Sequence, residues 1–118
     1  MKTIMLVDDS TAIRNILKNA LIGEYAVVEA ENGAVALDRI GAQPVDLFLF
    51  DVNMPVMDGL SLLSEVRKRP SYRSTPILML TTETKDELRQ KGRELGASGW
   101  IVKPCESDKL LSAIKKLL

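Results

Sequence analysis

Short apolar runs alternate along this chain with longer segments in which apolar residues recur at helical spacing. A run of four apolar residues is too short for a helix and is typical of a strand buried on both faces. The predicted strands lie at 4–7, 25–30, 47–50, 76–80 and 100–102. Helices are predicted from Ser10 or Thr11 to Gly23, around 36–40, between Gly59 and Pro70, over 85–95 and from about Ser107. Five strand–helix units predict an α/β protein, (βα)5, with right-handed crossovers and a doubly wound parallel five-stranded sheet.

Two of these elements differ from the rest in composition. The strand at 25–30 is more polar than the others, which places it near an edge of the sheet. The helix over 85–95 is strongly charged and has only Leu88, Gly92 and Leu95 to face inward, so we expect it to be the least firmly held helix. The first helix has a broader inward face, made of Ile13, Ile16, Leu17, Ala20 and Leu21.

Polar side chains stand at the ends of four of the predicted strands. Asp8 and Asp9 follow the first strand and Asp51 follows the third. Thr81 follows the fourth strand and Lys103 the fifth. The carboxyl ends of parallel strands meet at one edge of the sheet, which is the usual binding edge of such folds. Three carboxylates brought together there repel one another unless a cation is present, and their oxygens suit Mg²⁺ before zinc or copper.

The bulk composition narrows the range of functions. A chain of 118 residues is expected to form one domain, 1–118. A net charge of +0 gives no indication of a nucleic-acid partner. The single cysteine excludes an internal disulfide and the first apolar run is too short for a signal peptide or a membrane span, so we expect a cytoplasmic protein. The absence of histidine removes the commonest metal ligand and any phosphohistidine carrier.

The strand-end residues form a sufficient set for phosphoryl transfer, in which catalysis is mainly positioning and charge neutralisation. Asp51 supplies a carboxylate, which is a nucleophile known to form aspartyl-phosphates. Lys103 supplies an ammonium group and Thr81 a hydroxyl group. Each residue also has a plainer interpretation: Asp8 and Asp9 as caps of the first helix, Thr81 as an ordinary strand-end residue, and Lys103 as a surface lysine.

These motifs together resemble the receiver domain of two-component response regulators. The residues that carry the resemblance are Asp8-Asp9, Asp51, the loop Met54-Pro55 to Asp58-Gly59, Thr81 and Lys103-Pro104. It spans essentially the whole chain and is closest to the single-domain chemotaxis type, the CheY-like proteins. The resemblance implies a flavodoxin-like fold with strand order 2-1-3-4-5 and a cis Lys103–Pro104 peptide bond. Gly59 is either a turn residue or a site of close approach, and a turn is a sufficient explanation.

The resemblance also implies how the acidic residues act. Asp51 is the phosphoacceptor. Asp9, Asp51 and the main-chain carbonyl of Asn53 hold Mg²⁺ directly, and Asp8 acts through water. Lys103 pairs with the phosphoryl group.

Three further positions take their roles from the same resemblance. Thr81 moves to donate a hydrogen bond to the phosphoryl group. Trp100 stands where the family has a switch aromatic, commonly Tyr or Phe, although a static half-buried indole on an edge strand is an equal alternative. Asn53 and Glu83 occupy the positions that tune how fast water attacks the acyl phosphate.

The function implied is signalling by a protein that catalyses only its own phosphorylation and dephosphorylation. A histidine kinase would supply the phosphoryl group, and a chemotaxis-type phosphorelay is expected. No second domain is expected after the last helix, so the output should be contact with a downstream protein, without nucleic acid or a membrane. A monomer is expected. The expected contact face is formed by the fourth helix, the fifth strand and the last helix, with Lys85, Arg89, Arg93, Trp100, Lys109 and Lys115.

Three other functions must be weighed against this one. A haloacid-dehalogenase-like phosphatase needs a substrate cap and a second aspartate two residues after the first, where this chain has Asn53. A flavodoxin-type nucleotide or flavin module needs a glycine-rich phosphate loop after the first strand, where this chain has Asp8-Asp9. A receiver-like adaptor that works without phosphorylation would have no use for the intact acidic set.

Overall fold

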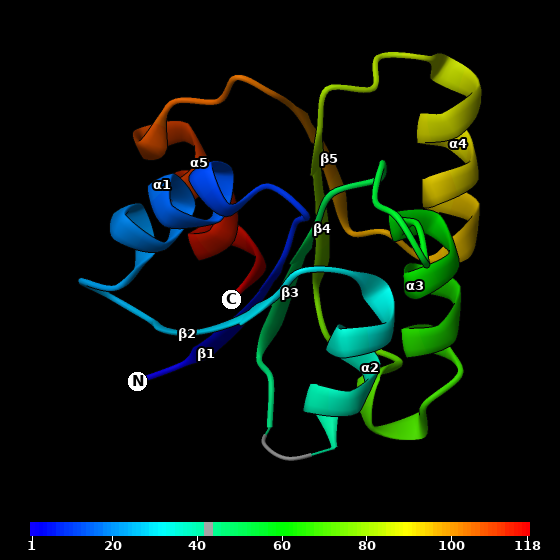
Figure 1. Cartoon of the computed structure of the whole chain (residues 1–118), viewed down its shortest axis with the longest axis horizontal. Helices are drawn as coiled ribbons and strands as arrows, with labels where there is room; N and C mark the ends of the chain where they lie inside the picture. The colour runs from blue at the N-terminus through cyan, green and yellow to red at the C-terminus, as the bar shows by residue number, and fades with distance from the viewer. Residues whose placement is uncertain (42–43) are drawn as a thin grey trace.

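The computed structural model describes residues 1–41 and 44–118, which form a parallel sheet between two layers of helices (Figure 1). The strands are β1 (Thr3–Val7), β2 (Ala26–Ala30), β3 (Leu47–Phe50), β4 (Ile77–Thr81) and β5 (Gly99–Val102). The helices are α1 (Thr11–Leu21), α2 (Gly33–Ile40), α3 (Gly59–Arg67), α4 (Asp86–Leu95) and α5 (Ser107–Leu117), with a 3₁₀ turn at Pro70–Tyr72. In these residues, no helix is both long and apolar enough to cross a membrane.

The sheet has the strand order β2-β1-β3-β4-β5, and every neighbouring pair is parallel. This confirms the predicted fold class and strand order, and it places the polar strand β2 at an edge. The chain leaves β1 toward β2 and returns on the other side of β1 as β3. A crevice therefore opens between the carboxyl ends of β1 and β3, where such sheets bind their ligands.

The helices cover both faces of the sheet. Figure 1 shows α1 and α5 on one face and α2, α3 and α4 on the other. Side chains alternate between the two faces along each strand, so Met5 and Phe48 pack in the core under α2 and α3, and Ile4 and Leu47 pack under α1 and α5. All four are fully buried, each contributing about 1.5–3 kcal/mol. Burial on both faces explains why these strands read as continuous apolar runs.

Polar caps fix where the helices begin. The Ser10 side chain accepts a hydrogen bond from the Ile13 N–H at 3.2 Å, so the first helix is capped by Ser10 and not by Thr11. Asn32 and Asp58 cap α2 and α3 in the same way. At the other end of α4, Gly96 takes the left-handed conformation, with φ of 107°.

One predicted core position is wrong. Ile16 was expected on the inward face of α1, but its side chain is 61% exposed. Successive helix residues are rotated by about 100°, and the line that faces the sheet passes through Leu17 and Leu21. Ile16 lies beside this line and borders a hollow that Pro104 and Cys105 also line.

Arg67 forms hydrogen bonds to three backbone carbonyls at the edge of the sheet opposite the crevice. Its guanidinium group donates hydrogen bonds to the carbonyls of Tyr72, Thr75 and Gly96, at 2.6–3.1 Å. Burial lowers the pKa of Arg67, but an arginine remains charged near neutral pH. Nothing in the amino-acid sequence indicates this cluster of hydrogen bonds, because the three carbonyls belong to the backbone.

Candidate functional site

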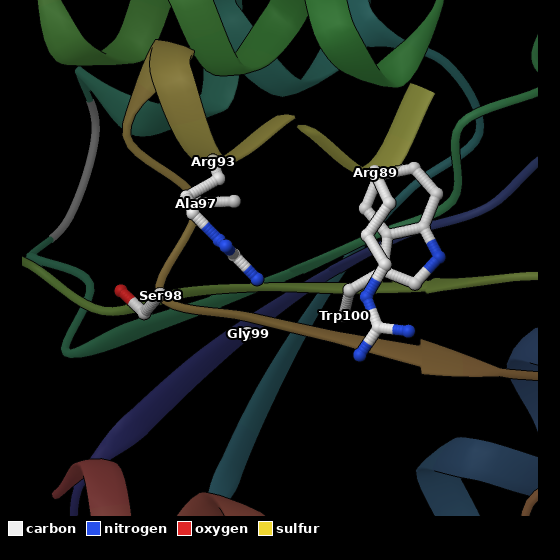
Figure 2. Close-up of a pocket in the computed structure, with 6 residues that line it drawn as sticks. All are labelled: Arg89, Arg93, Ala97, Ser98, Gly99 and Trp100. Carbon is white, nitrogen blue, oxygen red and sulfur yellow. The ribbon is translucent and has the colours of Figure 1, made fainter. Parts of the chain in front are cut away.

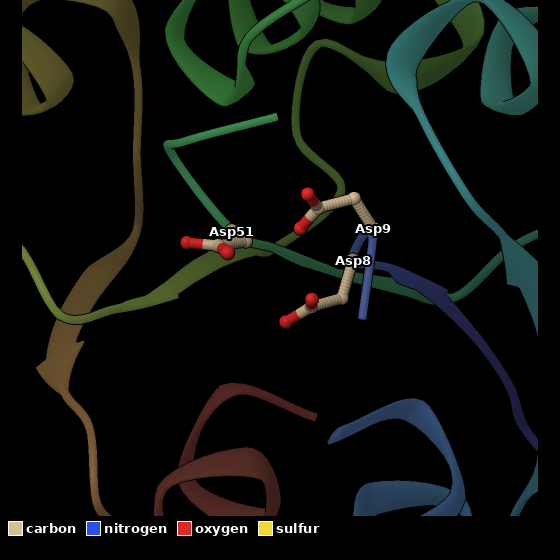
Figure 3. A group of neighbouring side chains, drawn as sticks. All are labelled: Asp8, Asp9 and Asp51. Atoms are coloured by element: carbon tan, nitrogen blue, oxygen red, sulfur yellow. The ribbon is translucent and has the colours of Figure 1, made fainter. Parts of the chain in front are cut away.

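The crevice between β1 and β3 holds three carboxyl groups. Asp8 and Asp51 directly follow neighbouring strands, and the Asp51 N–H donates to the Val7 carbonyl at 3.0 Å. Asp8, Asp9 and Asp51 each place a carboxylate oxygen within 4.8 Å of the other two. Figure 3 shows the carboxyl groups of Asp8 and Asp9 on the side of their backbone that faces Asp51. The structure thus brings together the acidic residues that were predicted to meet.

Lys103 completes this acidic cluster. Its Nζ lies 2.6 Å from Asp8 Oδ2 and 3.4 Å from Asp51 Oδ2. All three side chains are largely buried, which limits the screening of their charges by water. Three carboxylates and one ammonium group leave two formal negative charges, and the donors are all hard oxygen atoms. The residues present therefore fit a doubly charged cation such as Mg²⁺.

Asp8 is held from two sides by α1. The Ser10 N–H donates to Asp8 Oδ1 at 2.9 Å, and the Arg14 guanidinium donates to the Asp8 carbonyl at 2.5 Å. Arg14 Nε also lies 3.5 Å from a carboxylate oxygen of Glu29 on β2. Arg14 is not among the predicted site residues, since helical spacing does not show which side chain reaches back to the preceding strand.

Glu83 connects the other predicted residues of the site. Its N–H donates to the hydroxyl oxygen of the fully buried Thr81 at 3.2 Å, and its carbonyl accepts from Trp100 Nε1 at 3.2 Å. Its carboxylate accepts from Asn53 Nδ2 at 3.1 Å. Glu83 thereby joins the loops that follow β3 and β4 to strand β5. The metal-binding role of the Asn53 carbonyl stays a prediction.

Two backbone features stand out between Asp51 and the start of α3. At Gly59, a Cβ atom would lie 2.0 Å from the Asp51 carbonyl oxygen, so a turn alone does not explain this glycine. Val56 takes a left-handed conformation with φ of 69° while its side chain is 81% exposed. A β-branched residue rarely adopts that conformation, which makes this loop strained. The Lys103–Pro104 bond is cis, as expected.

Comparison with known proteins gives consistent matches over nearly the whole chain. The family model of the response regulator receiver domain matches residues 4–115. The chemotaxis protein CheY4 of Vibrio cholerae is 41% identical, with a TM-score of 0.96, and the match covers 100% of this chain and 99% of that one. A CheY-like receiver domain protein from Methanospirillum hungatei JF-1 is 33% identical, with a TM-score of 0.92 and coverage of 99% and 94%. The receiver domain of a signal transduction histidine kinase from Syntrophus aciditrophicus is 32% identical, with a TM-score of 0.91 and coverage of 100% and 90%.

Proposed function

This chain belongs to the response regulator receiver domain family, and on that premise we propose that it takes a phosphoryl group from a histidine kinase onto Asp51 and signals by contact with a downstream protein. The family acts in two-component signalling, and its members are signalling proteins, not enzymes that turn over a substrate. We take residues 1–118 as one receiver domain in a chemotaxis-type pathway. Its cytoplasmic location remains a prediction.

The contact of Asp51 with Lys103, beside Asp8 and Asp9, is the observation that carries the proposal. An oxygen of the Asp51 carboxylate forms a bond to phosphorus while the bond from phosphorus to the donor's histidine nitrogen breaks, and that nitrogen keeps the electron pair. Lys103 Nζ is already 3.4 Å from the Asp51 carboxylate, so it can pair with the arriving phosphoryl oxygens after a short movement.

The acidic residues would serve as the Mg²⁺ ligands that receiver domains generally provide. Asp9, Asp51 and the Asn53 carbonyl would bind the ion directly, and Asp8 would hold it through water. Bound Mg²⁺ would supply neutralisation of the phosphoryl oxygens. Glu83 and Asn53, which hydrogen-bond to each other, lie beside this position and would control the approach of a hydrolytic water.

The experiment that tests this function is incubation with Mg²⁺ and a small phosphoramidate donor, followed by measurement of the intact mass. We expect one added phosphoryl group on the wild-type protein and none on Asp51→Asn. Asp38→Asn, an exposed acid on α2, is the matched control and should be modified normally. No adduct on the wild type would favour the adaptor alternative, and continuous hydrolysis of varied phosphoesters would favour the phosphatase.

Transmission to the output face is proposed to run through Thr81, Glu83 and Trp100. If the Thr81 side chain rotates so that its hydroxyl donates to the phosphoryl group, it loses the hydrogen bond from the Glu83 N–H. Trp100 donates a hydrogen bond to the Glu83 carbonyl, so a movement of Glu83 would reach Trp100. We expect phosphorylation to change Trp100 fluorescence emission in the wild type and to leave it unchanged in Thr81→Ala. An equal change in both proteins would mean that the phosphoryl group quenches Trp100 directly, without this coupling.

A further inference from the structure

Arg14 of α1 is largely buried, whereas two arginines of α4 remain exposed to solvent. Arg89 and Arg93 are exposed and border a hollow that Trp100 also lines (Figure 2). The side chain of Arg14 is only 14% exposed. Because a buried guanidinium group loses its bonds to water, its donors need acceptors within the protein. The acceptors that Arg14 reaches therefore indicate its role.

All three nitrogens of the Arg14 guanidinium group contact the chain. Nη1 donates to the Asp8 carbonyl at 2.5 Å, and Nη2 donates to the hydroxyl oxygen of Thr11 at 3.3 Å. Nε lies 3.5 Å from a carboxylate oxygen of Glu29 on β2. The group thus connects the edge strand β2 with the end of β1, through a planar set of donors that a lysine does not have.

The carbonyl that Arg14 holds belongs to the peptide group between Asp8 and Asp9. Asp8 is also fixed by its own N–H, which donates to the Ala30 carbonyl at 3.2 Å, and by its contact with Lys103. Asp9 is exposed, and none of the ion pairs in the described part of the chain includes it. Because a peptide group is planar, a bond that fixes its carbonyl also fixes the direction in which the next residue begins. The direction of the Asp9 side chain therefore depends on this bond.

The charge of Arg14 cannot itself help to bind a cation. A positive charge next to Asp8 repels Mg²⁺, so electrostatic attraction does not explain an arginine at this position. Glu29 offsets part of the charge and also pairs with Lys18, at 3.3 Å. What favours binding is the fixed geometry of the donors, which hold the backbone that carries the acids.

We propose that Arg14 is a positioning residue for the acidic cluster: by holding the Asp8 carbonyl, it directs the Asp9 carboxylate toward the bound ion. The proposal rests on the proposed function, because it concerns the Mg²⁺ ligands named there. Glu29 in turn holds Arg14 in place. The edge strand β2 therefore contributes to metal affinity, although it supplies none of the proposed ligands.

Titration of the full chain with MgCl₂, followed by the amide NMR resonances of Asp9 and Asp51, measures the dissociation constant of Mg²⁺ in the folded state. We expect Arg14→Gln to raise this constant about tenfold, which is the smaller end of the range for contacts that orient metal ligands. Arg14→Lys keeps the charge and should raise the constant by a smaller factor, since one ammonium group cannot reach both Asp8 and Glu29. Lys18→Gln is the matched control. It removes the same charge and another bond to Glu29, one helical turn further from Asp8, and should leave the constant unchanged.

The direction of the change separates positioning from the other roles of an arginine. An effect of charge alone predicts tighter Mg²⁺ binding in Arg14→Gln and no change in Arg14→Lys, and either result would overturn the proposal. A purely structural role predicts lower stability to urea in EDTA with an unchanged dissociation constant, which would overturn it as well. Equal weakening in Arg14→Gln and Lys18→Gln would assign the effect to the charge balance around Glu29 instead.

The wild type reports separately on the proposed function. A wild-type protein that binds no Mg²⁺ would overturn the proposed metal site, and the role of Arg14 with it. Normal Mg²⁺ binding and phosphoryl uptake by the wild type, with an unchanged constant in both Arg14 variants, would overturn the role of Arg14 alone. Should Arg14→Gln fail to fold, the charge-matched comparison of Arg14→Lys with the wild type decides the question in the same way.

Discussion

At the scale of single residues, Gly59 decides how closely α3 approaches the phosphoacceptor candidate. The first residue of α3 lies against the backbone of Asp51, and the Gly59 N–H donates to the Val52 carbonyl at 2.8 Å. A side chain at 59 would need the space that the Asp51 carbonyl occupies. The backbone that carries Asp51 could not keep its position, because a backbone atom cannot rotate away as the end of a side chain can.

We therefore expect Gly59→Ala to lower the free energy of unfolding by about 2–3 kcal/mol. Gly23→Ala is the control, since a Cβ there meets nothing within 4 Å and should change stability by less than about 1 kcal/mol. Urea unfolding of the two variants measures the difference. Equal stability of the two would show that the loop after Asp51 can move aside without cost.

At the scale of elements, Arg67 links the end of α3 to the loop before β4 and to the C-terminus of α4. Only Gly92 of α4 is fully buried, and Leu88 and Leu95 pack partly buried against the core. The Gly96 carbonyl, which follows this helix, accepts from both Nε and Nη2 of Arg67. A lowered pKa in a basic group means that the folded state disfavours the proton. The free energy of unfolding therefore rises with pH across the range in which Arg67 loses its proton. Because an arginine titrates only in strongly alkaline solution, the effect is confined to that range.

Replacing Arg67 by Met should cost about 3 kcal/mol of stability, because the carbonyls of Tyr72, Thr75 and Gly96 lose charged donors. Arg67→Lys should recover only part of this loss, since one ammonium group cannot reach all three carbonyls. Hydrogen exchange of α4 should accelerate in both variants. Arg69→Met removes a single long bond of 3.5 Å to the Leu37 carbonyl and should have little effect. An unchanged exchange rate in α4 would show that Arg67 does not hold this helix.

The elements themselves could be predicted because their causes are local. The four consecutive apolar residues Leu47–Phe50 predict a buried strand by themselves, and the capping side chain of Ser10 predicts the start of a helix by itself. The acidic cluster could also be predicted, since parallel strands bring their carboxyl ends together. For Gly59, the sequence left a turn and a close approach both open. The contacts of Arg67 could not be predicted, because they depend on backbone atoms that only the folded chain brings close.

At the scale of the whole molecule, repulsion within the acidic cluster lowers the stability of the folded state. Asp9 has no ion pair with Lys103, and it adds a third negative charge to a crevice that already holds two buried carboxylates. This repulsion is present in the folded chain and is reduced when the chain unfolds and its charges separate. A divalent ion bound there, as proposed, would reverse the effect, because it would bind the folded state and not the unfolded chain.

Asp9→Asn should accordingly raise the stability of the metal-free protein by about 1 kcal/mol. In the wild type, stability should increase by about 1.4 kcal/mol for each tenfold rise in Mg²⁺ concentration above the dissociation constant. The variant should show little of this increase. Urea unfolding in EDTA and in a Mg²⁺ series measures both effects, with Asp38→Asn as the control. Wild-type dependence on Mg²⁺ in Asp9→Asn would exclude Asp9 as a ligand.

The short contact between Lys103 and Asp8 has a consequence for the order of events during biosynthesis. Lys103 lies among the acids, so the shape of the crevice is held by the chain's own residues. Small zinc domains differ, since they acquire structure only with their metal. If these acids hold Mg²⁺ as proposed, a newly made copy of the protein would not need the ion in order to fold, and it could bind and release the ion repeatedly afterwards.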